Sequence, residues 1–195
     1  MKFQYNKSAI QDFTRQLAIR EKALPILKNK ETVLRQQEKK AAQALEELMN
    51  ERAQIRQELE AFEPYWKEFP PIVTMKDSGV YEKKVVGVRV PEVEEVTFRV
   101  ADIAWWHYPA WVPAGVQIMQ RALAIDVKID TKNQQRELLS AARKKMTQKV
   151  NLYEKVQIPA YEEAIRKIKR FLEDKENIAK AAQHIVKKIK ARRTA

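Results

Sequence analysis

The sequence predicts a mainly α protein, a long antiparallel two-helix coiled coil with a small β-hairpin insert in the middle. Two observations predict it: the placement of glycine and a seven-residue repeat. The 195 residues include three glycines, all in the middle of the chain, at Gly79, Gly87 and Gly115. Because glycine destabilises helix interiors, the glycine-free flanks favour two long helices around an irregular centre. We therefore expect a helix over 6–62, an insert over 63–115 and a helix over 116–190.

The seven-residue repeat runs through the first helix from Ile10 to Phe62. Twelve of its sixteen seam positions are apolar, against 45% for the whole chain, and this enrichment is typical of a coiled-coil seam. The exceptions are all charged: Arg20, Glu31, Glu38 and Arg52. Charged seam positions reduce stability, but they can fix the register between two helices.

Prolines mark where each helix should bend or end. Pro25 removes one backbone hydrogen bond, at a cost of about 3 kcal/mol inside a helix, so we expect a bend or a restart near 21–25. Pro64 and the Pro70–Pro71 pair should end the first helix. In the second helix, an apolar stripe at three–four spacing continues from Ile158 with an offset of one residue, and Pro159 predicts a bend there.

The insert contains two runs of alternating apolar and polar residues, 86–90 and 96–100. This alternation is typical of half-buried strands, so the runs predict a β-hairpin or a pair of short strands separated by residues 91–95. Three tryptophans follow, Trp105, Trp106 and Trp111. They either pack the insert against the helices or form an exposed docking patch for a partner, and the sequence leaves both open.

Net charge is +12 and is uneven along the chain: +3 over 1–62, −2 over 63–115 and +11 over 116–195. A basic C-terminal segment suits an acidic protein surface, nucleic acid or an anionic lipid, and it is also compatible with a plain solvated helix face. We take the basic tip as a candidate surface for acidic protein loops. Its residues are Lys187, Lys188, Lys190, Arg192 and Arg193.

No motif indicates catalysis or a cofactor. The chain has no cysteine, which excludes thiolate metal sites and cysteine nucleophiles. Three scattered glycines form no phosphate-binding loop, and His107 and His184 lie too far apart in the sequence to indicate a metal site. With no signal-like segment and no stretch of membrane-spanning length, we expect a soluble cytoplasmic protein.

Three segments, in this order, resemble the D subunit of V-type and archaeal-type rotary ATPases, the V-type form also found in bacteria. They are ILKNKETVL at 26–34, VVGVRVPEVE at 85–94 and KVNLYEKVQIPAYEEAIRKIKRFLEDKEN at 149–177. The matching hairpin signature is Gly87, Val88, Val90 and Pro91. The matching C-terminal signature is Val150, Asn151, Glu154, Ile158 and Pro159.

The resemblance implies a non-catalytic central stalk, or rotor shaft, that carries torque between an ATP-hydrolysing or ATP-synthesising hexamer and a membrane ion-translocating ring. The implied partners are the catalytic A and nucleotide-binding B subunits of the hexamer, the small F subunit of the rotor and a socket protein, with one copy of this chain per complex. In the family, the hairpin influences turnover of the hexamer. Two other interpretations stay open: a basic coiled-coil scaffold and a nucleic-acid-binding protein. Against the latter, the tryptophans lie outside the basic segment, so bases would lack a basic and aromatic surface to stack on.

Overall fold

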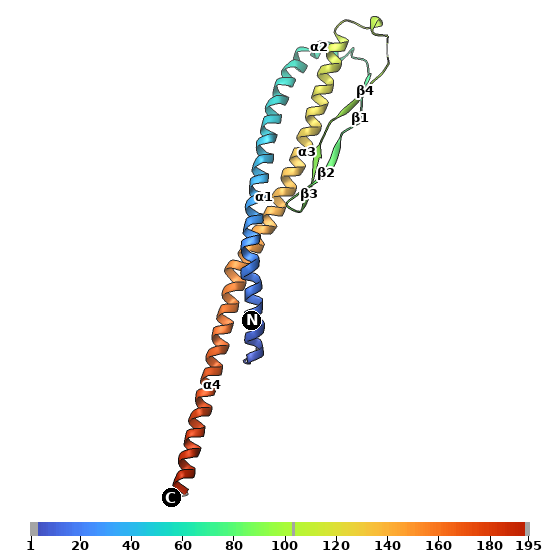
Figure 1. Cartoon of the computed structure of the whole chain (residues 1–195). Coiled ribbons are helices and arrows are strands. Elements are labelled where there is room, and N and C mark those ends of the chain that lie inside the picture. The colour runs from blue at the N-terminus through green and yellow to red at the C-terminus, as the bar shows by residue number, and fades with distance from the viewer. Residues whose placement is uncertain (1–3, 103, 194–195) are drawn as a thin grey trace. The chain divides into compact units, whose positions relative to one another are not determined.

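The computed structural model describes residues 4–102 and 104–193, excluding the side chains of Trp105 and of residues 191–193. The chain is mainly helical, with a small β insert (Figure 1). It divides into two compact units. Unit 1 comprises Met1–Asn29 and Met146–Ala195, and unit 2 comprises Lys30–Lys145. Helix α1 (Lys7–Ala61) contributes to both units.

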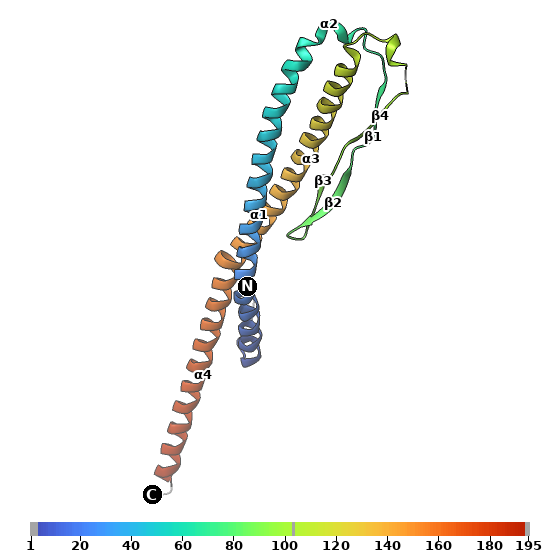
Figure 2. The ribbon, with the colours of Figure 1, turned by 45° about the horizontal axis from the view of Figure 1, so that its top comes forward.

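In unit 2, the second half of α1 pairs with α3 (Val112–Asn151). Buried apolar side chains from both helices form one core cluster: Leu45, Ile55, Ile125 and Ile129. Leu48, Leu59 and Ala122 pack against this cluster. The β insert runs alongside α3, as two views show (Figures 1 and 2). The seam predicted for α1 therefore does bury apolar residues against the second long helix.

The insert forms two antiparallel two-stranded sheets. In the first, β1 (Val73–Asp77) pairs with β4 (Thr97–Val100). In the second, β2 (Val80–Val85) pairs with β3 (Val88–Val93). The insert is therefore a β-hairpin, but our expectation that its turn falls at residues 91–95 is wrong. The turn falls at residues 86–87, and the two predicted runs pair with β2 and β1 instead of with each other.

Pro91 lies inside β3, although its presence in the sequence predicted a turn there. Its partner across the sheet is Glu82. Two residues separate Val85 from Val88, and in such a hairpin alternate pairs exchange backbone hydrogen bonds. The 3.0 Å bond from Glu94 N to Gly79 O belongs to this series. Pro91 then falls at a position where no backbone N–H is needed, so proline is tolerated.

A second cluster holds the β insert to the start of α3. Ile72 and Val112 are buried in it with Val116, and Phe69 and Trp111 pack against them. Between α1 and the strands lie the short helix α2 (Glu63–Trp66) and the residues that follow it, and α1 ends at Ala61, before Pro64, as predicted. A short 3-10 helix, η1 (Trp105–His107), precedes α3.

In unit 1, the first part of α1 pairs with α4 (Ile158–Arg193), whose buried residues include Tyr161, Ala164 and Ile168. Asn6 caps α1, because its Oδ1 accepts a 2.7 Å hydrogen bond from the Ala9 N–H. Helix α1 continues through Pro25 without a restart, and the bend expected near 21–25 stays a prediction. Within unit 1, α4 extends beyond the N-terminus of α1 (Figure 1).

The second long helix contains a π-helical segment, η2 (Leu152–Gln157), between α3 and α4. The Ile158 N–H bonds to Tyr153 O, five residues back. This winding precedes Pro159 directly, where an α-helix would lose a hydrogen bond and the proline ring would clash with the carbonyl four residues back. The structure therefore shows a change of winding just before Pro159, and the bend expected there stays a prediction.

Candidate functional site: polar pairs, hairpin and π segment

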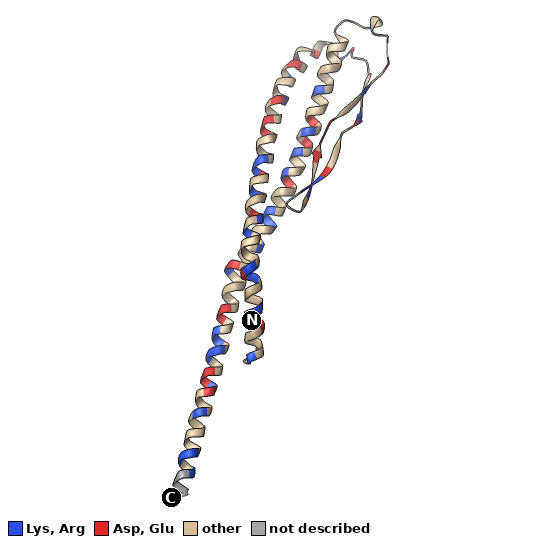
Figure 3. Cartoon of the chain, viewed as in Figure 1, with Lys and Arg blue, Asp and Glu red and all other residues tan. Residues whose placement is uncertain are grey.

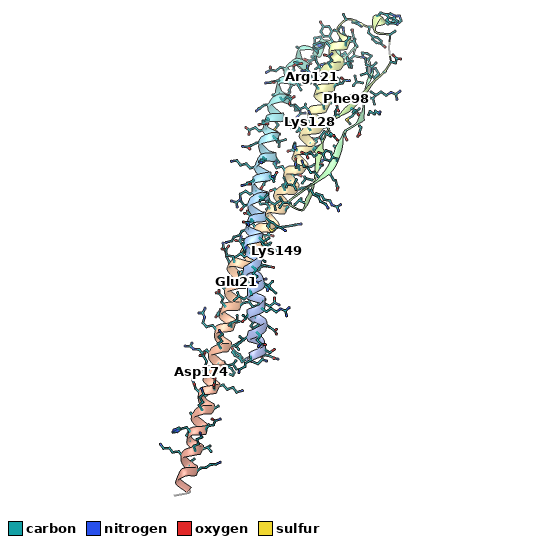
Figure 4. The ribbon with its side chains drawn as sticks, viewed as in Figure 1. Glu21, Phe98, Arg121, Lys128, Lys149 and Asp174 are labelled. Carbon is teal, nitrogen blue, oxygen red and sulfur yellow. The ribbon has the colours of Figure 1, made fainter. Side chains whose placement is uncertain are left out.

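Two charged seam positions in unit 2, Glu38 and Arg52, pair across the two long helices, whereas Glu31 pairs with Arg35 on its own helix. Glu38 of α1 bonds with Arg143 of α3, and Arg52 lies 2.8 Å from Asp126. Toward the end of α1, Glu58 bonds with Arg121, which Figure 4 labels on α3. Residue numbers rise along α1 as they fall along α3, so the helices are antiparallel.

These ion pairs contribute little to stability and act mainly on register. The two side chains of the Arg52–Asp126 pair are about half exposed, and exposed pairs are worth roughly 0–1 kcal/mol each. Glu38 and Arg143 are less exposed. Because each pair forms at one alignment of the helices only, the set selects a register that a uniform apolar seam would leave open.

Within unit 2, the β2–β3 hairpin is connected to α3 through the Glu92 carboxylate, which has three polar neighbours. Glu92 accepts from Lys83 Nζ at 2.7 Å and from the Tyr81 hydroxyl at 3.3 Å. Lys132 of α3 lies 3.8 Å from its other oxygen. The hydrogen bond from Lys83 holds the pKa of Glu92 below its ordinary value, and the pKa of Lys83 is correspondingly raised. Glu92 thus links the hairpin to α3.

The hairpin signature residues occupy the turn and β3. Gly87 has a φ of 86°, and Val86 beside it has a φ of 52°. Val90 is 0% exposed, whereas Val88 and Pro91 are half-buried. The sequence analysis placed Val86 in an alternating run and missed its turn conformation, because a β-branched side chain in the left-handed region is rare and no sequence pattern signals it.

Of Trp105, Trp106 and Trp111, the two whose side chains the structure describes differ in burial. Trp111 packs in an aromatic cluster, with its ring centre 5.2 Å from that of Tyr65 and 6.3 Å from that of Phe69. Trp106 is 82% exposed. The side chain of Trp105 lies outside the described residues. Trp111 therefore has a packing role, and exposed docking remains a prediction for Trp106.

The C-terminal signature surrounds the π segment of unit 1. Val150 and Asn151 end α3, Glu154 lies in η2, and Ile158 and Pro159 begin α4. Glu154 pairs with Lys28 of α1 at 2.6 Å. The signature therefore coincides with the change of helical winding.

Arg20 of α1 contacts three residues of this region. Its Nε donates to Gln157 Oε1 at 2.5 Å, and its guanidinium carbon lies 4.7 Å from the Tyr161 ring centre and 5.8 Å from that of Tyr153. The sequence analysis noted Arg20 as a charged seam position and noted the one-residue offset of the stripe. It did not connect the two, although the offset is the sequence signal of an extra residue in a helix.

The basic tip is at the end of α4 (Ile158–Arg193), and Figure 3 shows Lys and Arg residues along the part of α4 that extends beyond α1. Residues 175–195 include seven basic residues and one acidic residue. Lys187, Lys188 and Lys190 are exposed, and the side chains of Arg192 and Arg193 lie outside the described residues. The contact of this tip with acidic protein loops stays a prediction.

Across residues 4–102 and 104–193, no group of three or more metal-ligating side chains is placed to hold an ion. A pocket of about 310 Å³ lies between the long helices and the hairpin, and Lys128, which lines it, is labelled in Figure 4. In the same described ranges, no helix is long and apolar enough to cross a bilayer.

These features define a class: chains in which two long helices, far apart in sequence, pair antiparallel and are separated by a small β insert. The chain belongs to the ATP synthase D subunit family, whose pattern matches residues 9–188. It is similar to the D subunit of the V-type ATP synthase of Borreliella burgdorferi, with 30% identity over 103 residues, 53% of this chain. The matched region spans about half of that relative (51%).

Proposed function

We propose that this chain is the central-stalk component of a V-type ATPase and that it transmits torque between the ATP-hydrolysing or ATP-synthesising hexamer and the membrane ion-translocating ring. Family membership over residues 9–188 supports this proposal. The observation that carries it furthest is the antiparallel pairing of two long helices with polar pairs along the seam, because a shaft must keep its register under load. On this proposal the two helices form a coiled coil and the chain is not itself catalytic.

The partners follow from the resemblance. We propose the A and B subunits of the hexamer around the paired helices, the F subunit of the rotor and a socket protein at the insert, and one copy of this chain per complex. The chain would then be cytoplasmic and attached to the membrane only through the complex. The exposed ring of Trp106 is the candidate contact at the insert, and the basic tip is the candidate contact with acidic loops of the hexamer.

Two experiments test these statements in order. A tagged chain is first purified from its own cells at low salt after nuclease treatment. We expect it to bring down two large nucleotide-binding proteins, each at about three copies per copy of this chain, with ATPase activity. Recovery of the chain without those proteins refutes the stalk assignment. Nucleic acid that is recovered with the chain and is lost on nuclease treatment favours the interpretation as a nucleic-acid-binding protein.

Torque is tested on the reconstituted complex. The absence of cysteine lets one substitution, Lys76→Cys in the exposed part of β1, carry a bead. With the hexamer fixed to a surface, we expect the bead to rotate in one direction when ATP is added and to stay still without it. ATP hydrolysis with a stationary bead would contradict torque transmission while leaving the stalk assignment intact.

A further inference from the structure

We propose that Arg20 is a positioning residue, which holds η2 in its π form and thereby sets the register of α4 against the first part of α1. The inference concerns unit 1 alone and does not rest on the function proposed above. It starts from the offset of one residue in the apolar stripe, which an uninterrupted α-helix could not accommodate.

The offset has a simple geometric meaning. In an α-helix, four residues turn about 40° past a full circle, so three residues spaced by four spread over about 80°. A π turn contains more residues per turn, so four residues fall short of a full circle. The π segment therefore returns Tyr153, Gln157 and Tyr161 to one face of the helix.

Arg20 contacts all three members of this row. Its guanidinium lies near the rings of Tyr153 and Tyr161, and its Nε donates to the Gln157 side chain. A second nitrogen, Nη1, donates to Gln16 O at 3.0 Å and to Gln16 Oε1 at 2.6 Å. Because Gln16 is one turn earlier on α1, these bonds orient the guanidinium through contacts within α1 alone.

The consequence extends along α4. Tyr161, Ala164 and Ile168 are buried with the π segment in place. If η2 rewound as α-helix, the chain beyond it would rotate by about 100°, and these residues would leave the face that meets α1. Each place on that face would then be taken by the preceding residue in the sequence.

Neither Pro159 nor Lys28 accounts for η2 being a π segment instead of α-helix. Pro159 disfavours a regular α hydrogen bond at its own position, but a kinked α-helix would satisfy it equally. The Lys28–Glu154 pair is 47% and 43% exposed, and exposed pairs are weak. Arg20 contacts both ends of the row, Tyr153 and Tyr161.

Cross-linking within the cysteine-free chain tests the proposal. Tyr5 and Phe171 lie in contact, with ring centres 4.7 Å apart. Tyr5→Cys is combined with a cysteine at 170, 171 or 172, and each pair is treated with a short bis-maleimide. We expect reaction to be fastest at 171. With Arg20→Met, we expect the ratio of reaction at 171 to that at 170 to fall about fivefold, the change that an arginine–ring contact of ordinary strength supports.

The matched background is deletion of Val156, an exposed residue of η2. The deletion removes the extra residue, so a continuous α-helix already presents the stripe to α1. In that background we expect Arg20→Met to leave the preferred position unchanged. Arg15→Met, an exposed arginine on the same helix, should change nothing in either background.

Two results would overturn the proposal: an unchanged ratio in Arg20→Met, or an equal fall with and without Val156. The equal fall would mean that Arg20 only packs. Far-UV circular dichroism checks that each variant is helical. If Arg20→Met unfolds, Arg20→Lys, which keeps the charge but loses the planar stacking group, is scored by the same two comparisons.

Discussion

Replacing Val86 with asparagine should stabilise the β2–β3 hairpin. Val86 and Gly87 both have positive φ, as a two-residue type I′ turn requires. The left-handed conformation costs an ordinary residue about 1–2 kcal/mol, whereas asparagine tolerates it. Val86 is half-buried and borders a cavity with Ala41 of α1. Losing about half of a valine's burial, roughly 0.7 kcal/mol, offsets part of the gain, which leaves a net stabilisation of about 0.3–1.3 kcal/mol.

Hydrogen exchange of the β3 amides measures this change locally, without requiring the two units to unfold together. Protection should rise about two- to ninefold, because local opening is governed by the free energy of the hairpin. Val85→Asn is the matched control: the same chemical change one residue earlier, inside β2 and opposite Val88, should lower protection. Equal losses in both variants would show that packing of Val86 outweighs its backbone strain.

Three further predictions concern the hairpin, the aromatic cluster and the tip. Because the pKa of Glu92 is lowered from 4.5, its contribution to stability is present above that pH and is lost as pH falls through the lowered value; Glu92→Gln should remove this acid dependence in NMR titrations of the hairpin amides. Trp111→Ala should lower the free energy of unfolding by about 2 kcal/mol, less than the roughly 3–5 kcal/mol of a fully buried tryptophan, because Trp111 is half-buried. Trp106→Ala should leave it unchanged, and equal effects would contradict the packing role of Trp111. Neutralising the basic tip should weaken hexamer binding most at low salt, and unchanged affinity there would refute the acidic-loop contact. The tip substitutions are Lys187→Gln, Lys188→Gln, Lys190→Gln, Arg192→Gln and Arg193→Gln.

Helix content could be predicted from the sequence because it depends on local patterns. The glycine-free flanks and the heptad repeat located the long helices, and the alternating runs located strands. The strand partners could not be predicted, because alternation does not specify which runs meet. Pro91 has the character of a turn residue, although a two-stranded sheet offers positions where its missing N–H has no consequence. The turn at Val86 carries no signal, since its strain is tolerated only in the folded context.

For the charged seam positions, the sequence shows the residues but does not show their partners. Their existence at Arg20, Glu38 and Arg52 was visible, and so was the possibility that they fix register. Their partners were not, since Gln157, Arg143 and Asp126 lie more than seventy positions away in the sequence. A partner can be assigned only when the alignment of the helices is known, and the alignment is the property that the pairs themselves determine.

The polar pairs in unit 2 and the π segment in unit 1 both select one register of the paired helices. An apolar seam repeated every seven residues is nearly unchanged when one helix slides by a heptad, so hydrophobic burial alone distinguishes such registers weakly. In unit 2, ion pairs of unequal spacing break this degeneracy. In unit 1, the extra residue near Pro159 breaks it by winding, because only one alignment places the π turn opposite Arg20. A helix pair that must keep its alignment under a twisting load needs such features more than it needs additional burial.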